Sequence, residues 1–450
     1  MKDSNVLLVT IDSLRYDKLI NIDVPATPCI NSLSTSGCEF TQAVSNGPNT
    51  TASFPAILTG THSLSYGPYG VLDKDKSPFL ARSLSRENYD TIGYHSNPFL
   101  GNEQNYHTGF EVFNDLVDGS DSVTTAKDRI ERQLDPDSLF YHLLRRIWHL
   151  FSVTTDTKSY ARGDSITGGA IDWMEARRSD DPFFMWLHYM DVHYPFDPPK
   201  WVFDELPFDR PSNRRIVTLN GMMQERPEEL DEQDVRDLKR LYFAEARFVD
   251  RQIGRMIDAI ADMGELEDTI IAVTADHGEA FGEHDRFGHH VYPYDELIRV
   301  PLVIGGGPID SQTVDEQVQL LDLAPTLLDL VSIDVPKEME GRSIAPLLRG
   351  EDSFELSHPA MFISESGKTF GVRTEQWKFI RRSTTNEKLL FDLESDPNEE
   401  VNVASANGDV IENLENIILE YEESVDAGVA DIEWSDETKE RLQNLGYLQE

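Results

Sequence analysis

VLLVTI at residues 6–11 and IIAVTA at residues 270–275 are the stretches that decide the fold, and an aspartate directly follows each of them. Continuous runs of β-branched and aliphatic residues are typical of strands that are buried on both faces of a parallel sheet. In open α/β sheets, ligands bind just beyond the carboxyl ends of such strands. The two runs therefore predict that Asp12, Asp276 and the adjacent His277 meet at one edge of a sheet.

Two carboxylates and an imidazole at that edge would form a metal-binding cage from Asp12, Asp276 and His277. The simpler alternative is that each aspartate only caps the helix that follows its strand, because Asp is a favoured N-cap residue. For either aspartate alone, the two interpretations are equally good. The alternative does not account for both aspartates together with the attached histidine, so we favour the metal site.

Strand-like and helical segments alternate along the chain, which predicts an α/β fold with a doubly wound, mostly parallel sheet flanked by helices. Further strands are expected at residues 40–44, 89–95, 182–189 and 300–304, and a long helical segment from about 231 to 263. From about residue 354, short strands joined by turns predict an antiparallel meander that is followed by a helix at about 410–424. We therefore expect a metal-binding domain over residues 1–353 and a small C-terminal α+β subdomain over residues 354–450.

Residues 115–162 do not fit this alternation, and we expect them to form a helical insertion or a lid. Within this segment, residues 139–151 have the pattern of an aromatic amphipathic helix. The simpler interpretation is a helix that packs over the core. The alternative is a surface that makes peripheral contact with a membrane or meets a partner.

The composition of the chain limits its partners, its stabilisation and its location. Its 450 residues carry a formal net charge of −41. Such an acidic surface repels nucleic acid. The acidity is spread over the whole length, and the simplest cause is a salt-loving, halophilic cytoplasm. Cys29 and Cys38 are the only cysteines, so a disulfide framework is excluded. The first expected strand begins near residue 6 and no apolar stretch could span a bilayer, so we expect a cytoplasmic protein without a transmembrane segment.

A set of short motifs occurs in a fixed order along the chain: VTIDSLRYD at 9–17, the segment from Thr27-Pro28 to Gly37, FTQA at 40–43, ILTG at 57–60, HYPF at 193–196, TADHGE at 274–279, RVPL at 299–302, LAPT at 323–326, GRS at 341–343 and LFDLESDP at 390–397. With these motifs in this order, the chain resembles the sulfatase family, within the alkaline phosphatase superfamily. Each motif alone is weak, but the ordered set is specific and covers nearly the whole chain.

This resemblance implies an alkaline-phosphatase-like fold and a metal-dependent hydrolase of sulfate or phosphate esters, acting on a small-molecule, glycan or lipid ester. It also implies one divalent cation at the sheet edge, and Asp12, Asp276 and His277 match the positions of its ligands. Hard oxygen ligands with one imidazole suit Ca, Mg or Mn.

Three further histidines match family positions near the ester. His193 is similar to the family histidine that contacts the ester or its leaving group. His289 and His290 lie where the family has a Lys or His that faces the anion, and spacing alone does not choose between them. The alternative for this pair is two solvent-facing histidines.

The sequence departs from the family pattern at the nucleophile. Family sulfatases have Cys or Ser there, in the pattern C/S-x-P-x-R, and oxidise it to formylglycine. Counting back from LTG at 58–60 puts this position on Thr50, with Ala52 in place of the Pro and Phe54 in place of the Arg. Thr51 takes its place if the loop differs by one residue. Threonine cannot become formylglycine, but its hydroxyl can attack directly, as in the phosphoethanolamine and phosphoglycerol transferases of the superfamily.

Ser13 is a further departure from the family pattern, because many sulfatases have a second Asp at this position. These departures leave three interpretations of the function. The first is a hydrolase of sulfate or phosphate esters. The second is a phosphoryl-group transferase that uses Thr50, and the third is a non-catalytic protein that holds a metal and an anion. A Thr50 that only caps a helix would fit the third. The retained metal ligands and His193 argue against it, and we favour the hydrolase.

Overall fold

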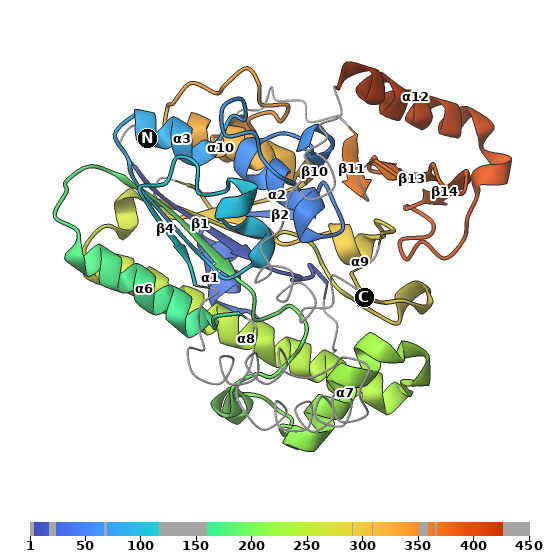
Figure 1. The fold of residues 1–450 in the computed structure, drawn as a ribbon, viewed down its shortest axis with the longest axis horizontal. Helices are drawn as coiled ribbons and strands as arrows, with labels where there is room; N and C mark the ends of the chain where they lie inside the picture. Colours follow the sequence, from blue (N-terminus) through green and yellow to red (C-terminus); the bar gives the residue numbers. More distant parts are fainter. Residues whose placement is uncertain are drawn as a thin grey trace, which may run out of the picture.

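The computed structural model describes residues 4–17, 24–66, 70–116, 160–289, 291–307, 309–350, 359–364 and 367–425. Over these ranges the chain forms a central sheet with helices on both faces and a second, smaller sheet at one side (Figure 1). The amphipathic helix predicted at 139–151, and most of the insertion predicted at 115–162, lie outside the described residues.

The central sheet has eight strands in the order β10-β2-β9-β6-β1-β5-β3-β4. The strands are β1 (Asn5–Ile11), β2 (Cys38–Val44), β3 (Asp90–His95), β4 (Val112–Asp115), β5 (Phe183–Tyr189), β6 (Thr269–Ala275), β9 (Leu302–Gly305) and β10 (Gln312–Gln319). All pairs are parallel except the two that β9 makes with its neighbours β2 and β6. The predicted mostly parallel α/β sheet is confirmed.

The two apolar runs form the middle of this sheet, where β1 lies between β6 and β5. Every residue of β1, β5 and β6 is buried, as expected for strands that are covered on both faces. Ile11 and Ala275 are register partners at the carboxyl ends of β1 and β6. The next residue of each strand is therefore delivered to the same place.

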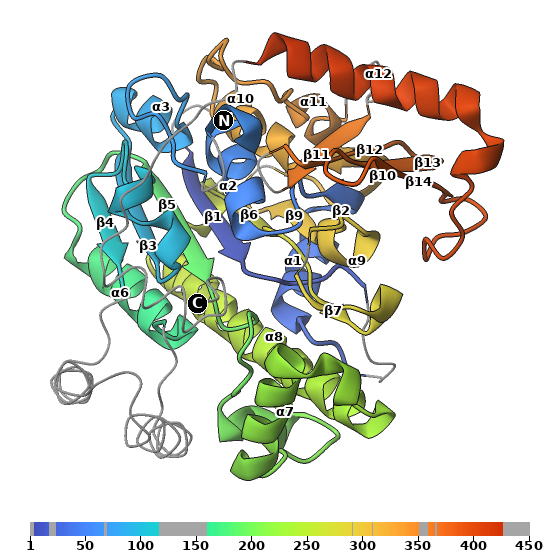
Figure 2. The same cartoon turned by 45° about the vertical axis from the view of Figure 1, so that its right-hand side comes forward.

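Helices cover the two faces of the sheet. Helices α1 (Pro28–Ser36), α6 (Gly163–Ala176) and α8 (Glu232–Asp262) pack together on one face, and α2 (Thr50–Thr59), α3 (Leu80–Arg86) and α10 (Leu323–Leu330) on the other (Figures 1 and 2). The remaining α-helices of the described segments are α7 (Asn213–Glu225), which packs on α8, the short α9 (Asp295–Ile298) and α11 (Ala345–Leu348), and α12 (Gly408–Ser424). Helix α8 begins after Asp231, which forms a reciprocal capping box with Asp234.

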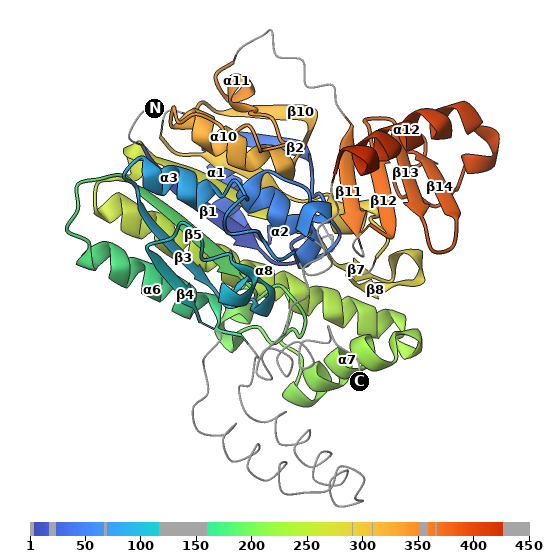
Figure 3. The same ribbon diagram turned by 45° about the horizontal axis from the view of Figure 1, so that its top comes forward.

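The C-terminal part is the predicted antiparallel meander, with strands β11 (Ala360–Ser364), β12 (Thr369–Arg373), β13 (Trp377–Arg382) and β14 (Glu387–Asp392) in sequential order. Helix α12 lies on this sheet (Figure 3). A further two-stranded ribbon consists of β7 (Ala280–Phe281) and β8 (Phe287–Gly288). The division into residues 1–353 and 354–450 stays a prediction, because its boundary falls within residues 351–358, outside the described ranges.

None of the helices in the described parts of the chain combines the length and the apolar character that crossing a bilayer requires.

A buried ion-pair cluster joins the small sheet to the large one. Lys378 on β13 is fully buried, and its Nζ lies 2.8 Å from Asp295 Oδ1 and 2.8 Å from Glu399 Oε1. Arg373 Nη2 lies 3.0 Å from the other oxygen of Asp295. Because Asp295 begins α9, this cluster fixes the C-terminal sheet to the segment that precedes β9.

Replacing Lys378 by Met should lower the free energy of unfolding by roughly 3–5 kcal/mol, since it leaves the buried carboxylate of Glu399 and the partly buried one of Asp295 with less compensating charge. The control is Lys388→Met, which breaks the more exposed pair between Lys388 Nζ and Glu415 Oε2 at 2.7 Å and should cost only about 0–1 kcal/mol. Chemical denaturation measures both, and equal losses would contradict a structural role for Lys378.

Candidate active site

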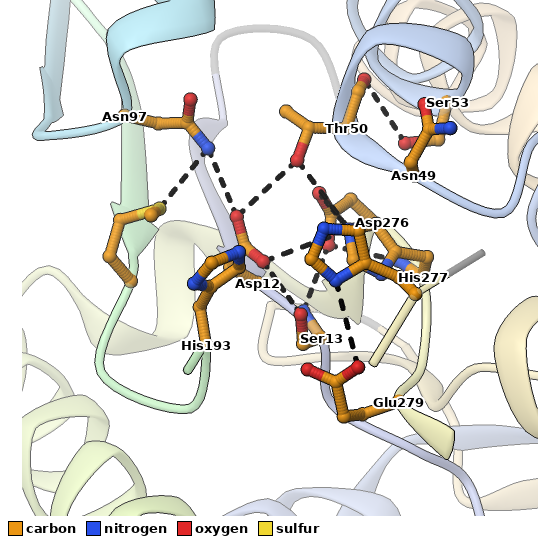
Figure 4. A network of polar contacts seen from close by, with 12 residues as sticks. Asp12, Ser13, Asn49, Thr50, Ser53, Asn97, His193, Asp276, His277 and Glu279 are labelled. Carbon is orange, nitrogen blue, oxygen red and sulfur yellow. Dashed lines mark hydrogen bonds and ion pairs between the residues drawn. The ribbon is translucent and has the colours of Figure 1, made fainter. Parts of the chain in front are cut away.

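The three predicted metal ligands meet at the carboxyl edge of the central sheet (Figure 4). Asp12 follows β1, and Asp276 and His277 follow β6. His277 Nε2 lies 3.7 Å from Asp12 Oδ1 and 3.5 Å from Asp276 Oδ2. All three side chains are fully buried, and their ligand atoms lie within 4.8 Å of one another. This group could hold one metal ion.

Hydrogen bonds fix the atoms that point away from this centre. Asp276 Oδ1 accepts from the backbone N–H groups of Ser13 at 3.2 Å and of His277 at 2.9 Å. His277 Nδ1 lies 2.8 Å from Gly278 O, so Nδ1 carries the proton and Nε2 presents its lone pair to the carboxylates. Asp276 Oδ2 is buried and accepts no hydrogen bond from the described residues. A buried oxygen of this kind fits a cation, because lone pairs without a donor are costly to bury.

The charges of the site also fit a cation. Burial would raise the pKa of Asp12, but the neighbouring His193, His188 and His277 outweigh burial and lower it. Burial and the charge of Asp12 raise the pKa of Asp276 well above its usual value. The negative charge of Asp12 therefore disfavours ionisation of Asp276, and a bound cation would stabilise both carboxylates in their charged form.

Thr50 is the first residue of α2 and lies beside the metal ligands. Its Oγ1 is 3.5 Å from Asp12 Oδ2 and 3.5 Å from His277 Nε2, and the residue is almost fully buried. Thr51 instead donates from its Oγ1 to Asn49 Oδ1 at 3.0 Å. Asn49 is the N-cap of α2, where its side chain accepts from the backbone N–H of Ala52, so the interpretation of Thr50 as the helix cap is wrong.

His193 and His289, two of the predicted histidines, lie next to this group. His193 is in the loop after β5, and its Nδ1 hydrogen-bonds to Tyr194 O. Its ring centre is 5.0 Å from that of His289, which in turn is 4.8 Å from that of His277. The structure thus brings His289 to the site, whereas His290 lies outside the described residues.

The pKa values of the two histidines shift in opposite directions. Burial lowers the pKa of His193 to about 4, which leaves this imidazole neutral near pH 7. Burial would also lower the pKa of His289, but its contact with the Glu279 carboxylate, at 3.6 Å from Nδ1 to Oε1, raises that pKa. A neutral imidazole can accept a proton and a charged one can donate it.

Sequence reasoning missed three residues around the metal ligands. Asn97, two residues after β3, donates from Nδ2 to Asp12 Oδ2 at 3.0 Å. His188 on β5 has its Nε2 3.5 Å from the same oxygen. Glu279 is fully buried beside His289. All three lie at or just beyond the carboxyl ends of core strands, so strand ends could have identified them as candidates.

Phe54 occupies the position of the family arginine and is fully buried. Its ring packs edge-on against His188 at 4.9 Å and against Trp186 at 5.8 Å between ring centres. An apolar ring therefore fills space beside the site where the family pattern has a cation.

Comparisons with known proteins agree with this geometry. The profile of the family described as Sulfatase matches residues 4–333, and one described as N-sulphoglucosamine sulphohydrolase, C-terminal, matches residues 282–424. An arylsulfatase of Clostridium perfringens is 26% identical over 478 residues, covering 95% of this chain and 96% of the relative.

Two solved structures show the same fold. The phosphonate monoester hydrolase of Agrobacterium radiobacter has a TM-score of 0.69 at 20% identity and covers 94% of this chain and 96% of its own. BT4656, solved with its substrate D-glucosamine-2-N,6-O-disulfate, has a TM-score of 0.68 at 19% identity and covers 94% of this chain and 98% of its own.

The fold and the buried triad define an α/β protein with a candidate metal centre at the carboxyl edge of its sheet, and the family match is more specific. This chain belongs to the sulfatase family. The expected class, a hydrolase of sulfate or phosphate esters, is confirmed, and the transferase and the non-catalytic interpretation are not favoured.

Removing one carboxylate should remove the metal. Asp276→Ala should abolish divalent-cation binding without unfolding the protein, because Asp276 supplies an oxygen that has no donor in the described structure. Metal content after dialysis and calorimetric titration measure this. Asp250→Ala is the matched control, since this buried aspartate accepts from the backbone N–H groups of Cys29 and Ile30. Full stoichiometric metal in Asp276→Ala would refute the assignment.

Proposed function

We propose that this protein hydrolyses phosphate esters in preference to sulfate esters, with Thr50 as the nucleophile and one divalent cation held by Asp12, Asp276 and His277. The position of Thr50 carries this proposal. Its hydroxyl oxygen lies 3.5 Å both from Asp12 Oδ2 and from His277 Nε2, while the hydroxyl of Thr51 is bonded to Asn49.

The side chains divide the work of the reaction. When bound, the cation would supply positive charge that polarises the ester and favours loss of the Thr50 proton. Thr50 Oγ1 gives its proton to Asp12 Oδ2, 3.5 Å away, and attacks phosphorus, and the P–O bond to the leaving group breaks in line. His289, whose pKa is raised by Glu279 against the effect of burial, gives a proton to the leaving oxygen. Neutral His193 then accepts a proton from the water that releases phosphate from Thr50.

Threonine chemistry favours phosphate over sulfate. The formylglycine of family sulfatases is a hydrated aldehyde that expels sulfate by elimination, and threonine has no second hydroxyl on that carbon. A group on Thr50 has to leave by direct attack of water, which a phosphoenzyme undergoes more readily than a sulfoenzyme would. The phosphonate monoester hydrolase fold neighbour is compatible with a phosphorus-centred substrate.

The cation and the setting are also part of the proposal. Carboxylate oxygens and one imidazole suit Ca, Mg or Mn. A small-molecule or glycan ester is the proposed substrate class, because the solved neighbour BT4656 carries a disulfated glucosamine as its substrate. We place the activity in a high-salt cytoplasm, since salt screens the mutual repulsion within a chain of net charge −41.

Thr50→Ala should lower turnover by roughly 10³-fold or more, as loss of a nucleophile does in other hydrolases. Metal affinity should stay within about tenfold, or roughly 1.4 kcal/mol, because Thr50 is not one of the three ligands. Thr51→Ala is the matched control and should keep its activity. Loss of turnover in Thr51→Ala with activity retained in Thr50→Ala would move the nucleophile by one residue.

Matched aryl esters test the reaction class. In high salt with Ca²⁺, Mg²⁺ or Mn²⁺, an aryl phosphate should turn over faster than the corresponding aryl sulfate, since Thr50 cannot release sulfate by elimination. Steady-state kcat/KM for both esters, with Thr50→Ala as the blank, measures this. Faster turnover of the sulfate that disappears in Thr50→Ala would overturn the phosphate preference.

A further inference from the structure

We propose that His188 is a positioning residue that orients the Asp12 carboxylate, at the end of a hydrogen-bond chain that begins at Trp186 and passes through Thr10. The inference rests on the proposed function in one respect, which is that Asp12 is a ligand of the cation. It concerns His188 and Trp186, which neither the motifs nor the metal triad include, and Thr10, to which the first motif assigns no role.

The chain crosses from β5 to β1 beside the site. Thr10 and His188 are register partners of the two parallel strands, and Trp186 lies two residues earlier on the same face of β5. Trp186 Nε1 is 3.0 Å from Thr10 Oγ1, which is 3.0 Å from His188 Nδ1. His188 Nε2 is 3.5 Å from Asp12 Oδ2. All four residues are fully buried, so water does not compete for these contacts.

The two ends of the chain set the direction of its hydrogen bonds. An indole N–H can only donate, so Thr10 Oγ1 accepts from Trp186 and keeps its own proton for His188 Nδ1. His188 then carries its proton on Nε2, where it faces the carboxylate of Asp12, which can only accept.

The opposite tautomer is less favourable. With the proton on His188 Nδ1, the Nε2 lone pair would face the Asp12 carboxylate inside the protein, which is electrostatically unfavourable. The Thr10 hydroxyl would then have to donate to Leu187 O at 3.5 Å, which is a longer contact.

This donor determines how Asp12 presents itself to the cation. Oδ2 faces His188 Nε2, accepts from Asn97 Nδ2 at 3.0 Å and lies 3.5 Å from Thr50 Oγ1. Oδ1 accepts from Ser13 Oγ at 2.8 Å and lies 3.7 Å from His277 Nε2, on the side of the triad. Groups that orient metal ligands in this way typically contribute about 10–100-fold in metal affinity.

Aromatic rings hold the His188 imidazole in place. The indole of Trp186 is stacked on it with ring centres 6.2 Å apart, and the ring of Phe54 meets it edge-on at 4.9 Å. The packing of these rings fixes the orientation of the His188 imidazole, and the hydrogen bond from the Thr10 hydroxyl to Nδ1 places the proton on Nε2.

The first test measures binding of Mn²⁺ alone by calorimetry. Thr10→Val removes the hydroxyl from the chain and should raise the Kd for Mn²⁺ about tenfold. Thr10→Ser restores a hydroxyl and should return the Kd to within about threefold of wild type, a tolerance below 1 kcal/mol.

Thr167→Val is the matched control. Thr167 is also fully buried, and its hydroxyl hydrogen-bonds to Tyr189 Oη at 2.8 Å without reaching Asp12. Both valine variants remove one fully buried hydroxyl, which contacts Trp186 and His188 in the case of Thr10 and Tyr189 in the case of Thr167, so a loss of metal affinity that came only from removing a buried hydroxyl would appear in both. The Kd of Thr167→Val should stay within about threefold of wild type.

The second test reads the tautomer directly in the wild-type protein. Long-range ¹H–¹⁵N correlation of protein with ¹⁵N-labelled histidine, with the His188 signals assigned through His188→Gln, should show Nε2 protonated and Nδ1 unprotonated. The opposite pattern would overturn the inference even if the valine variants failed to fold.

The outcomes separate this inference from the proposed function. Tight Mn²⁺ binding by wild type and equally tight binding by Thr10→Val would overturn the positioning role and leave the metal centre intact. Absence of Mn²⁺ binding in the wild type would overturn both.

Discussion

Asp12 and Asp276 place two carboxylates in one fully buried space at the ends of neighbouring strands, and the repulsion between them governs how the surroundings are built. Donors are arranged around the outer oxygens, from the backbone N–H of Ser13 and from the amide of Asn97. The inner oxygens face His277 Nε2. The strands that form the core of the protein thus also create a place where positive charge stabilises the folded chain.

The smaller, C-terminal sheet is connected to the site through helix α9. His277, Glu279 and His289 lie in the segment between β6 and β9, which also contains α9. The start of this segment contacts α9, because the backbone N–H of Gly278 donates to Leu297 O at 2.7 Å. Helix α9 is in turn tied to β13 through Asp295 and Lys378. The C-terminal sheet therefore supports the geometry of the site without supplying a residue to it.

Much of this architecture could be predicted from the sequence because burial on both faces leaves an unbroken apolar run. That is why β1 and β6 were predicted correctly, and with them the meeting of Asp12, Asp276 and His277 at one edge of the sheet. Strand β10 (QTVDEQVQ), at the edge of the sheet, was not predicted, because its polar residues, of which Gln317 and Gln319 are buried, leave no apolar run to mark it.

The residues around the metal ligands were harder to predict for a different reason. The contacts of Asn97 and His188 with Asp12 depend on which strands are neighbours, and the order of β3, β5 and β1 in the sheet differs from their order along the chain. Sequence spacing carries no information about that order. Counting along the chain did place Thr50 beside the triad, because the nucleophile motif and the helix it begins form one local unit.

The identity of residue 50 also affects how the protein becomes active in the cell. In family sulfatases a cysteine or serine at this position is oxidised to formylglycine, so the host of such a sulfatase has to make an enzyme that carries out this oxidation. Thr50 at the start of α2 is chemically complete when translation ends. The cell that makes this protein therefore needs no maturation step at this residue, and recombinant protein from a host without formylglycine-generating activity has the same residue 50 as the native one.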